Sequence, residues 1–181
     1  MNNDGQINDA DIIWMDKPNP PNATFGINMD FEYKGFSIGM LWQGAGGYAV
    51  EIWRQGADAF NSNLQPWHLE RWTPATANAA SFPRLGLNAK NNGSFQIPSD
   101  FWLKDARYLR LKQLNVGYTL PKEWLRRLCP IIQRAKVYII GYNLFTFSNV
   151  KKYNLDPEVD RTAYDTYPNT SNYTFGLQIG F

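Results

Sequence analysis

The chain has little of the chemistry on which most enzymes depend: among its 181 residues there is one cysteine, Cys129, and one histidine, His68. An internal disulfide is therefore excluded, and a lone cysteine carries no information on the redox compartment. A single histidine removes most metal-catalytic and triad arrangements. The net charge is only +2, with 19% charged residues, so no strong field directs the protein to nucleic acid. We therefore expect no nucleic-acid partner, and most metal-dependent and triad enzymes are excluded.

Long apolar runs are also absent, and none approaches the roughly 20 residues of a membrane-spanning helix. Residues 1–5 are polar and lack the apolar core of a secretory signal peptide. For an exported protein, this predicts that the true N-terminus lies far upstream. Aromatic residues, by contrast, are abundant: the chain has 7 Trp, 10 Tyr and 11 Phe. Aromatic side chains gather at membrane interfaces and on sugar-binding surfaces.

Apolar and polar residues alternate with a period of two in several segments, which predicts β-strands. The predicted strands cover residues 24–33, 36–44, 108–120, 136–147 and 173–181. Leu109 and Leu111 are out of phase with the rest of their strand, which fits a β-bulge near Lys112. The two faces of 136–147 stay unassigned. Residues 121–135 are typical of a short amphipathic helical turn, and a short helix is also predicted near 48–60.

The connections between these strands fall into two classes. Lys34-Gly35 and the segment from Pro121 are short, whereas the connections from Ala45 and Ser148 are long. Strands of about 9–11 residues match a tilted membrane crossing, and short turns on one side with long loops on the other are typical of outer-membrane barrels. A soluble antiparallel sandwich would show the same alternation and stays open as the alternative.

The last strand ends in an aromatic residue and resembles the sorting signal of outer-membrane proteins. Its alternating members are Tyr173, Phe175, Leu177, Ile179 and Phe181. This resemblance favours the barrel over the sandwich. Five strands are too few to close a barrel, because bacterial barrels start at about eight strands. We therefore expect an all-β fragment, the C-terminal part of a transmembrane β-barrel with long extracellular loops, or a chain that pairs with others.

A series of short motifs supports a more specific interpretation. In order they are 4–11 (DGQINDAD), 18–20 (PNP), 33–36 (YKGF), 71–74 (RWTP), 83–85 (PRL), 108–112 (YLRLK), 117–121 (GYTLP), 143–146 (NLFT), 156–159 (DPEV) and 174–177 (TFGL). Each is weak alone, but in this order they span essentially the whole chain. Together they resemble the C-terminal portion of SusC/RagA-family TonB-dependent outer-membrane transporters.

This resemblance implies a 22-stranded barrel with an N-terminal plug in the outer membrane of a Gram-negative bacterium, of the Bacteroidota. It implies import of glycans or peptides, energised through TonB, together with a SusD-like surface lipoprotein that acts as a lid. The barrel assembly machinery and the lipid bilayer are further implied partners. The plug, the TonB-contacting region and most strands lie outside this sequence. The alternative function is a secreted β-rich polysaccharide-binding module.

The first residues also fit a truncated calcium loop with Gly5 at its sixth position. Its oxygen ligands would be Asn2, Asp4, Gln6, Asn8 and Asp11. Oxygen donors at alternate positions suit Ca²⁺, and glycine permits the sharp turn. An Asx-rich surface turn accounts for the same residues. No cofactor is required, and Ca²⁺ is the one candidate.

Four tryptophans of the long connection are candidates for contact with substrate or partner: Trp53, Trp67, Trp72 and Trp102. Anchoring of the loop is the alternative role. The charged residues Asp105, Arg107, Arg110 and Lys112 are expected to line the barrel wall near its outer mouth. Arg126 and Arg127 complement the dipole of the short helix. Asp156 and Glu158 have the spacing of a carboxylate pair, but nothing around them indicates catalysis, and the resemblance implies a transporter and not an enzyme.

Overall fold

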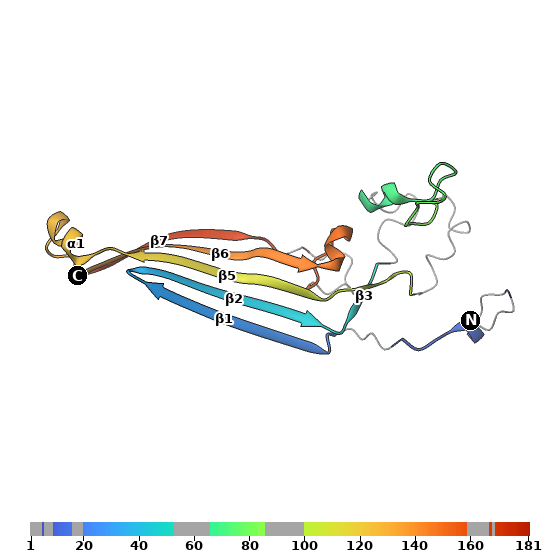
Figure 1. Cartoon of the computed structure of the whole chain (residues 1–181), viewed down its shortest axis with the longest axis horizontal. Helices are drawn as coiled ribbons and strands as arrows, with labels where there is room; N and C mark the ends of the chain where they lie inside the picture. The colour runs from blue at the N-terminus through green and yellow to red at the C-terminus, as the bar shows by residue number, and fades with distance from the viewer. Residues whose placement is uncertain are drawn as a thin grey trace.

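The computed structural model describes residues 5, 9–15, 20–52, 66–85, 100–158, 167 and 169–181. Its main element is a five-stranded antiparallel sheet in the order β1-β2-β5-β6-β7 (Figure 1). The strands are β1 (Ala23–Tyr33), β2 (Phe36–Gly46), β5 (Tyr108–Thr119), β6 (Arg134–Ser148) and β7 (Asn172–Gly180). Each begins and ends within two residues of the range predicted from its alternation.

The remaining elements are short. A two-stranded ladder joins β3 (Ala49–Glu51) to β4 (Leu103–Asp105), and the 3-10 helices are η1 (Asp9–Asp11), η2 (Pro66–Glu70) and η4 (Asn149–Tyr153). The helix predicted near 48–60 is wrong where it is described, because 49–51 pair with β4; residues 53–60 lie outside the described part.

The α-helix α1 (Lys122–Leu128) lies in the predicted segment 121–135 but is shorter. It ends at Cys129, which is extended (φ −158, ψ 109) because a following proline disfavours helical backbone. Among the described residues, no helix has the length and apolar character needed to cross a membrane.

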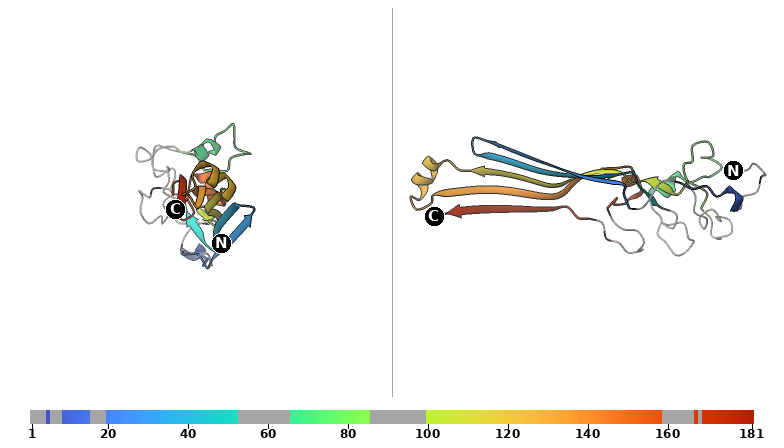
Figure 2. Two further views of the ribbon diagram at one scale, coloured as in Figure 1. Left: turned by 90° about the vertical axis from the view of Figure 1, so that its left-hand side faces the viewer. Right: turned by 90° about the horizontal axis from the view of Figure 1, so that it is seen from below.

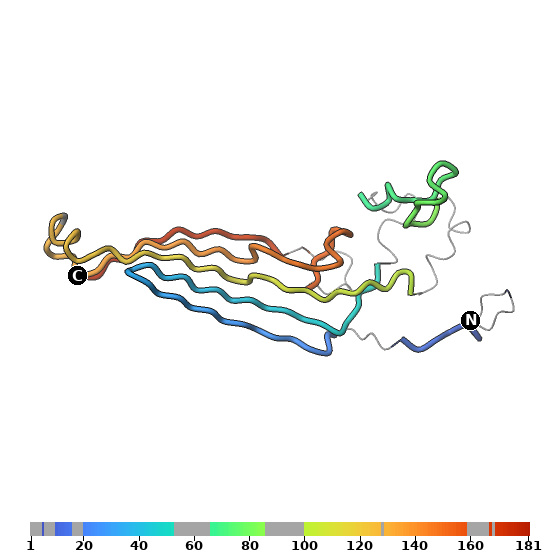
Figure 3. Tube along the Cα trace, in the orientation of Figure 1, coloured from blue at the N-terminus to red at the C-terminus, as the bar shows by residue number. Residues whose placement is uncertain are grey.

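The two classes of connection lie at opposite ends of the sheet. Lys34-Gly35, α1 and the C-terminus lie at one end, here called the turn end, at the left of Figure 1. β3, β4, η2 and η4 lie at the other, the loop end, as the second view in Figure 2 also shows. In the tube of Figure 3 the five strands run side by side between these ends. The short connections therefore lie at one end of the sheet and the long connections at the other, as the sequence predicted.

The register gives the sheet two chemically different faces. Directly paired residues of antiparallel strands point to the same face. One row across the sheet consists of Phe31, Ile38, Val116, Ile139 and Phe175. The neighbouring row consists of Asp30, Gly39, Asn115, Ile140 and Thr174. The face that carries the first row is called the apolar face below, and the opposite one the polar face.

Two irregularities keep Leu109 and Leu111 of β5, and Phe145 and Phe147 of β6, on the apolar face. Lys112 is an extra residue of β5 relative to β2, which is the predicted bulge. In β6 an extra residue lies between Tyr142, opposite Gln113, and Phe145, opposite Leu111. Asn143 has a positive φ of 52 there, a conformation that asparagine tolerates. This bulge resolves the faces of β6 that alternation left unassigned.

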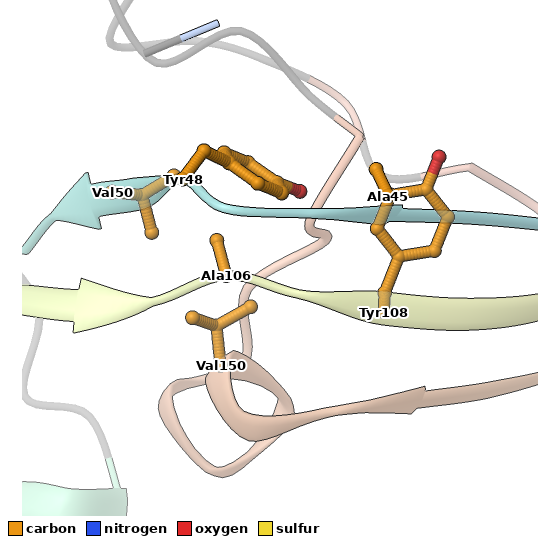
Figure 4. Close-up of a cluster of buried hydrophobic side chains, with 6 residues drawn as sticks. All are labelled: Ala45, Tyr48, Val50, Ala106, Tyr108 and Val150. Carbon is orange, nitrogen blue, oxygen red and sulfur yellow. The ribbon is translucent and has the colours of Figure 1, made fainter. Parts of the chain in front are cut away.

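Apolar packing is concentrated at the loop end rather than on the sheet. Figure 4 shows one cluster, in which Tyr48, Val50 and Ala106 of the long connection meet Val150 of η4. The Tyr48 hydroxyl donates a hydrogen bond of 2.8 Å to the carbonyl of Pro157, which joins the two long connections. On the apolar face, in contrast, large side chains are exposed across the described part of the chain; Phe175 is 76% exposed.

The β1–β2 turn provides a test of the fold. Lys34 and Gly35 both have positive φ (46 and 87), as in a type I′ hairpin turn. A Cβ at Gly35 would lie 2.8 Å from the Thr119 carbonyl oxygen. Gly35→Ala should destabilise the hairpin by about 1–2 kcal/mol. Gly46→Ala is the control, because a Cβ there meets nothing within 4 Å. Amide hydrogen exchange of β1 and β2 measures the difference, and equal protection in both variants would contradict it.

Candidate functional site

A cluster of charged side chains lies on the polar face at the loop end. It consists of Arg110 and Lys112 of β5 with Asp156 and Glu158, and is called the charge cluster below. Arg110 is opposite Gln43 and Thr146 in the register, so its side chain points to the polar face. The carboxylates follow η4, where the chain turns back over this face. The cluster therefore joins the second long connection to the sheet.

Arg110 is the centre of the charge cluster. Its Nη2 lies 2.7 Å from Asp156 Oδ1, its Nη1 donates to Glu158 Oε2, and its Nε donates to Thr146 Oγ1 at 2.8 Å. The side chain is only 3% exposed. Lys112 Nζ lies 2.8 Å from Glu158 Oε2, so two cations face two anions. Burial of a guanidinium is tolerated because its charge and its donors are matched.

Neutral groups complete the cluster. The Tyr108 hydroxyl donates to Glu158 Oε1 at 2.8 Å, and Gln43 Nε2 donates to the Tyr108 oxygen at 3.3 Å. The backbone N–H of Asn169 donates to Asp156 Oδ2 at 3.1 Å, and its Nδ2 to Glu158 Oε2 at 2.9 Å. All four carboxylate oxygens thus accept hydrogen bonds. Asp156 and Glu158 hold the loop in place and do not resemble an acid–base pair.

Tyr108, Gln43 and Asn169 were missed from the sequence. Tyr108 stands two residues before Arg110, and that spacing alone places both on one strand face. Asn169 carries no comparable signal, because its partner Asp156 is 13 residues away in the sequence. The exposed pair Asp105–Arg107 (35% and 69% exposed, 2.7 Å) lies outside the cluster.

A second cluster, here called the aromatic cluster, is built by the first long connection. Its buried members are Ile52, Trp67, Phe82 and Trp102. The ring centroid of Phe82 lies 4.7 Å from that of Trp67 and 5.4 Å from that of Trp102. Trp102 is 1% exposed, and Trp67 is also buried. Both indoles therefore serve as packing that fixes the loop, which is the anchoring role considered for them.

A pocket of about 490 Å³ opens beside this cluster. It is lined by Trp72, Phe82, Pro83, Arg84, Phe101 and Trp102, with Ala80 and Ser81. Trp72 is 40% exposed, so part of its ring is available to a ligand or partner. Lys104 lies over the Phe101 ring, 4.7 Å from its centroid. Burial, together with the charge of Lys152, lowers the pKa of Lys104, while Asp100 acts in the opposite direction.

The calcium ligands proposed from the sequence fall mostly outside the described part: Asn2, Asp4, Gln6 and Asn8. Gly5 is described and has φ 79, and Asp11 lies in η1. Within the described residues no group of three or more His, Cys, Asp or Glu could hold a metal ion. Trp53 also lies outside the described part.

The predicted sorting signal lies on and just beyond β7. Tyr173, Phe175 and Leu177 are exposed on the apolar face, with Ile179 next in phase. Phe181 follows the strand and is exposed.

The sequence and the structure were compared with those of known proteins, and the matches include a TonB-dependent receptor and RagAB transporter structures. No family model matches the sequence. The chain is 28% identical over its whole length to "TonB-dependent receptor P3" of Formosa agariphila, of which it covers 18%. The structure of the RagAB peptide transporter matches 92% of this chain with a TM-score of 0.66 and 27% identity. RagAB in the closed–closed state matches with the same score at 24% identity, which supports the fold alone.

The chain spans 18% of each of these relatives, so it corresponds to a part of such a protein. The five-stranded sheet therefore has the fold of a part of the RagAB structures. The comparisons confirm that the chain resembles part of a SusC/RagA-type TonB-dependent transporter, as its motifs indicated.

Proposed function

We propose that this chain forms part of the wall of an outer-membrane TonB-dependent transporter that imports peptides or glycans. The observation that carries the proposal is the contrast between the two faces of one sheet. The apolar face exposes large side chains in every strand, whereas the polar face holds the buried charge cluster. Lipid against the first face and an aqueous interior against the second would satisfy both.

The dimensions of the sheet agree with this arrangement. β1 and β2 each have 11 residues. At about 3.3 Å per residue and a tilt near 45°, such a strand spans roughly the 25 Å apolar band of an outer-membrane barrel. In water, many apolar side chains of this face would stay hydrated, which costs about 25 cal/mol of free energy per Å² of apolar surface. Within the described ranges no segment covers this face, so the bilayer is the proposed cover.

The alternative is a secreted polysaccharide-binding module. The aromatic pocket with the exposed Trp72 favours it, because flat rings stack on sugars. Such a module must bury one face of its sheet under a second layer, and the described part of the chain has none on the apolar face. The transporter proposal accounts for the same pocket as part of an extracellular loop.

The remaining roles follow from the resemblance. The loop end would face the cell exterior and contact a SusD-like lipoprotein and the substrate, while TonB would act through a region outside this sequence. Peptides are favoured by the RagAB relatives, which are described as peptide importers. The alternating residues of β7 with Phe181 would present the sorting signal to the barrel assembly machinery. Ca²⁺ at residues 2–11 would be a structural ligand.

Cell fractionation tests the proposal directly. An antibody against residues 148–158 should detect the protein in the outer membrane of the source organism, soluble only after detergent is added. The detected protein should be several times longer than this chain, because this chain covers only 18% of each relative. A protein of this length in a soluble fraction would support the binding module instead.

The pocket at the loop end should contribute to recognition. Trp72→Ala is expected to weaken lipoprotein capture or substrate uptake by about tenfold, the typical effect of truncating an interfacial tryptophan. Trp124→Ala is the matched control, because Trp124 is an exposed tryptophan at the turn end. Co-purification of the lipoprotein and uptake of labelled peptides or glycans are measured in parallel. Wild-type values of the Trp72→Ala variant in both assays would contradict a role of the pocket in recognition.

A further inference from the structure

The turn end carries an excess of positive charge. Its cations are Lys34, Lys122, Arg126, Arg127, Arg134 and Lys136, and its acidic side chains are Glu32 and Glu123. Lys122, Arg126 and Arg127 are exposed on α1. Within the described residues, the ion pairs all lie elsewhere, at Arg107, Arg110 and Lys112. The exposed cations of α1 are therefore available to an external anion.

The helix that carries them is held in a fixed position. Leu125 is buried, and the segment is tied to the sheet on both sides of α1. Leu120 N–H donates to the Ala135 carbonyl at 2.9 Å, and Gln133 N–H donates to the Gly180 carbonyl at 2.9 Å. With Leu125 directed inward, Trp124 is left 55% exposed. A helix dipole accounts for cations in the last turn, but not for an exposed tryptophan beside them.

The cations of α1 lie at the end of the sheet where the apolar face ends, because α1 directly follows β5. At this end the apolar face closes with aromatic side chains: Phe36 and Tyr118 have ring centroids 4.4 Å apart, and Tyr33 is exposed beside them. Tyrosine and tryptophan are enriched where a bilayer meets water, and lysine and arginine extend their charged ends to the same depth. Along the sheet toward α1, the exposed apolar residues are thus followed by aromatic residues and then by the cations of α1; Figure 1 shows α1 at this end of the sheet.

From this order we infer that the turn end, with α1 at its centre, binds the anionic headgroups of phospholipids in the adjacent leaflet. The inference rests on the proposed function, because it requires the apolar face to lie in the bilayer. Charge complementarity selects the headgroup, and continuity with the apolar face selects a lipid over a free phosphate. Arg126 and Arg127 contact the phosphates, while Trp124 lies at the level of the headgroups.

Native mass spectrometry of the transporter, extracted from its own outer membrane in detergent, tests the inference. Phosphatidylglycerol or phosphatidylcholine is added to the wild type and to the Arg126→Gln/Arg127→Gln variant. Loss of two cations should weaken phosphatidylglycerol binding about 30-fold and leave phosphatidylcholine binding unchanged. The control is Lys151→Gln/Lys152→Gln, which removes two exposed cations from η4 at the loop end. It should bind both lipids as the wild type does.

The outcomes separate the two proposals. Recovery of the wild type from a soluble fraction would overturn the proposed function. An outer-membrane variant that binds phosphatidylglycerol as tightly as the wild type would overturn only the headgroup site, and would direct attention to a protein partner. If the variant does not assemble, the wild type alone tests the headgroup site. Its preference for phosphatidylglycerol over phosphatidylcholine must then decrease as the salt concentration is raised. A missing or salt-independent preference would equally overturn the inference.

Discussion

Replacing Arg110 by methionine is expected to weaken the attachment of residues 149–158 to the polar face by about 3–5 kcal/mol. Methionine keeps much of the length of arginine but removes its charge and all of its donors. Asp156 and Glu158 would then be held near the sheet with Lys112 as the one remaining cation of the charge cluster. The loss should appear as faster amide hydrogen exchange in η4 and in the residues that follow it.

Arg107→Met is the matched control for that experiment. Its ion pair with Asp105 has the same 2.7 Å separation as Arg110–Asp156 but is exposed. Exposed pairs contribute about 0–1 kcal/mol, so exchange should change little. A further comparison is Arg110→Met combined with Glu158→Gln, which should cost less than the two single changes added together. Equal effects of Arg107→Met and Arg110→Met would contradict the central position given to Arg110.

Introducing a charge on the apolar face should have the second-largest effect. Phe175→Arg places a guanidinium in the middle of β7, between strand ends at Asn172 and Gly180. If this face contacts lipid, the substitution costs about 2–4 kcal/mol near the midplane of the bilayer. We expect less transporter in the outer membrane and a lower denaturant midpoint after refolding into vesicles.

The neighbouring residue supplies the control. Thr174 is opposite Ile140 and lies on the polar face, and both Thr174 and Phe175 are exposed in this chain. Thr174→Arg should therefore assemble as the wild type does. In a soluble module the two exposed sites would tolerate arginine alike. Full assembly of the Phe175→Arg variant would contradict the proposal that the apolar face contacts lipid.

The strands could be predicted because their alternation is a local property. A residue two positions along a strand always returns to the same face, so 24–33 and 173–181 needed no tertiary information. The bulge at Lys112 was predicted for the same reason, since Leu109 and Leu111 change phase around it. In β6 the change of phase depends on the positive φ of Asn143, which a run of apolar residues on both faces conceals.

The candidate site was only partly predictable. Arg110, Lys112, Asp156 and Glu158 were each singled out, but their pairing joins residues 46 or 48 positions apart, with α1, β6 and η4 between them. Burial of the tryptophans was equally hidden: Trp72 and Trp102 both belong to the first long connection, yet one is 40% and the other 1% exposed. Which ring is covered depends on how η2, Phe82 and β4 pack together.

The most direct test of the account compares Ile139→Cys with Ile140→Cys, each in a Cys129→Ser background, in intact outer membranes. The two isoleucines are adjacent in β6 but lie on opposite faces. The account predicts that position 139 reacts with a lipid-soluble maleimide and is protected from a water-soluble one, whereas position 140 is protected from the lipid-soluble reagent. Reaction of position 139 with the water-soluble reagent, at the rate seen for an exposed loop cysteine, would contradict it.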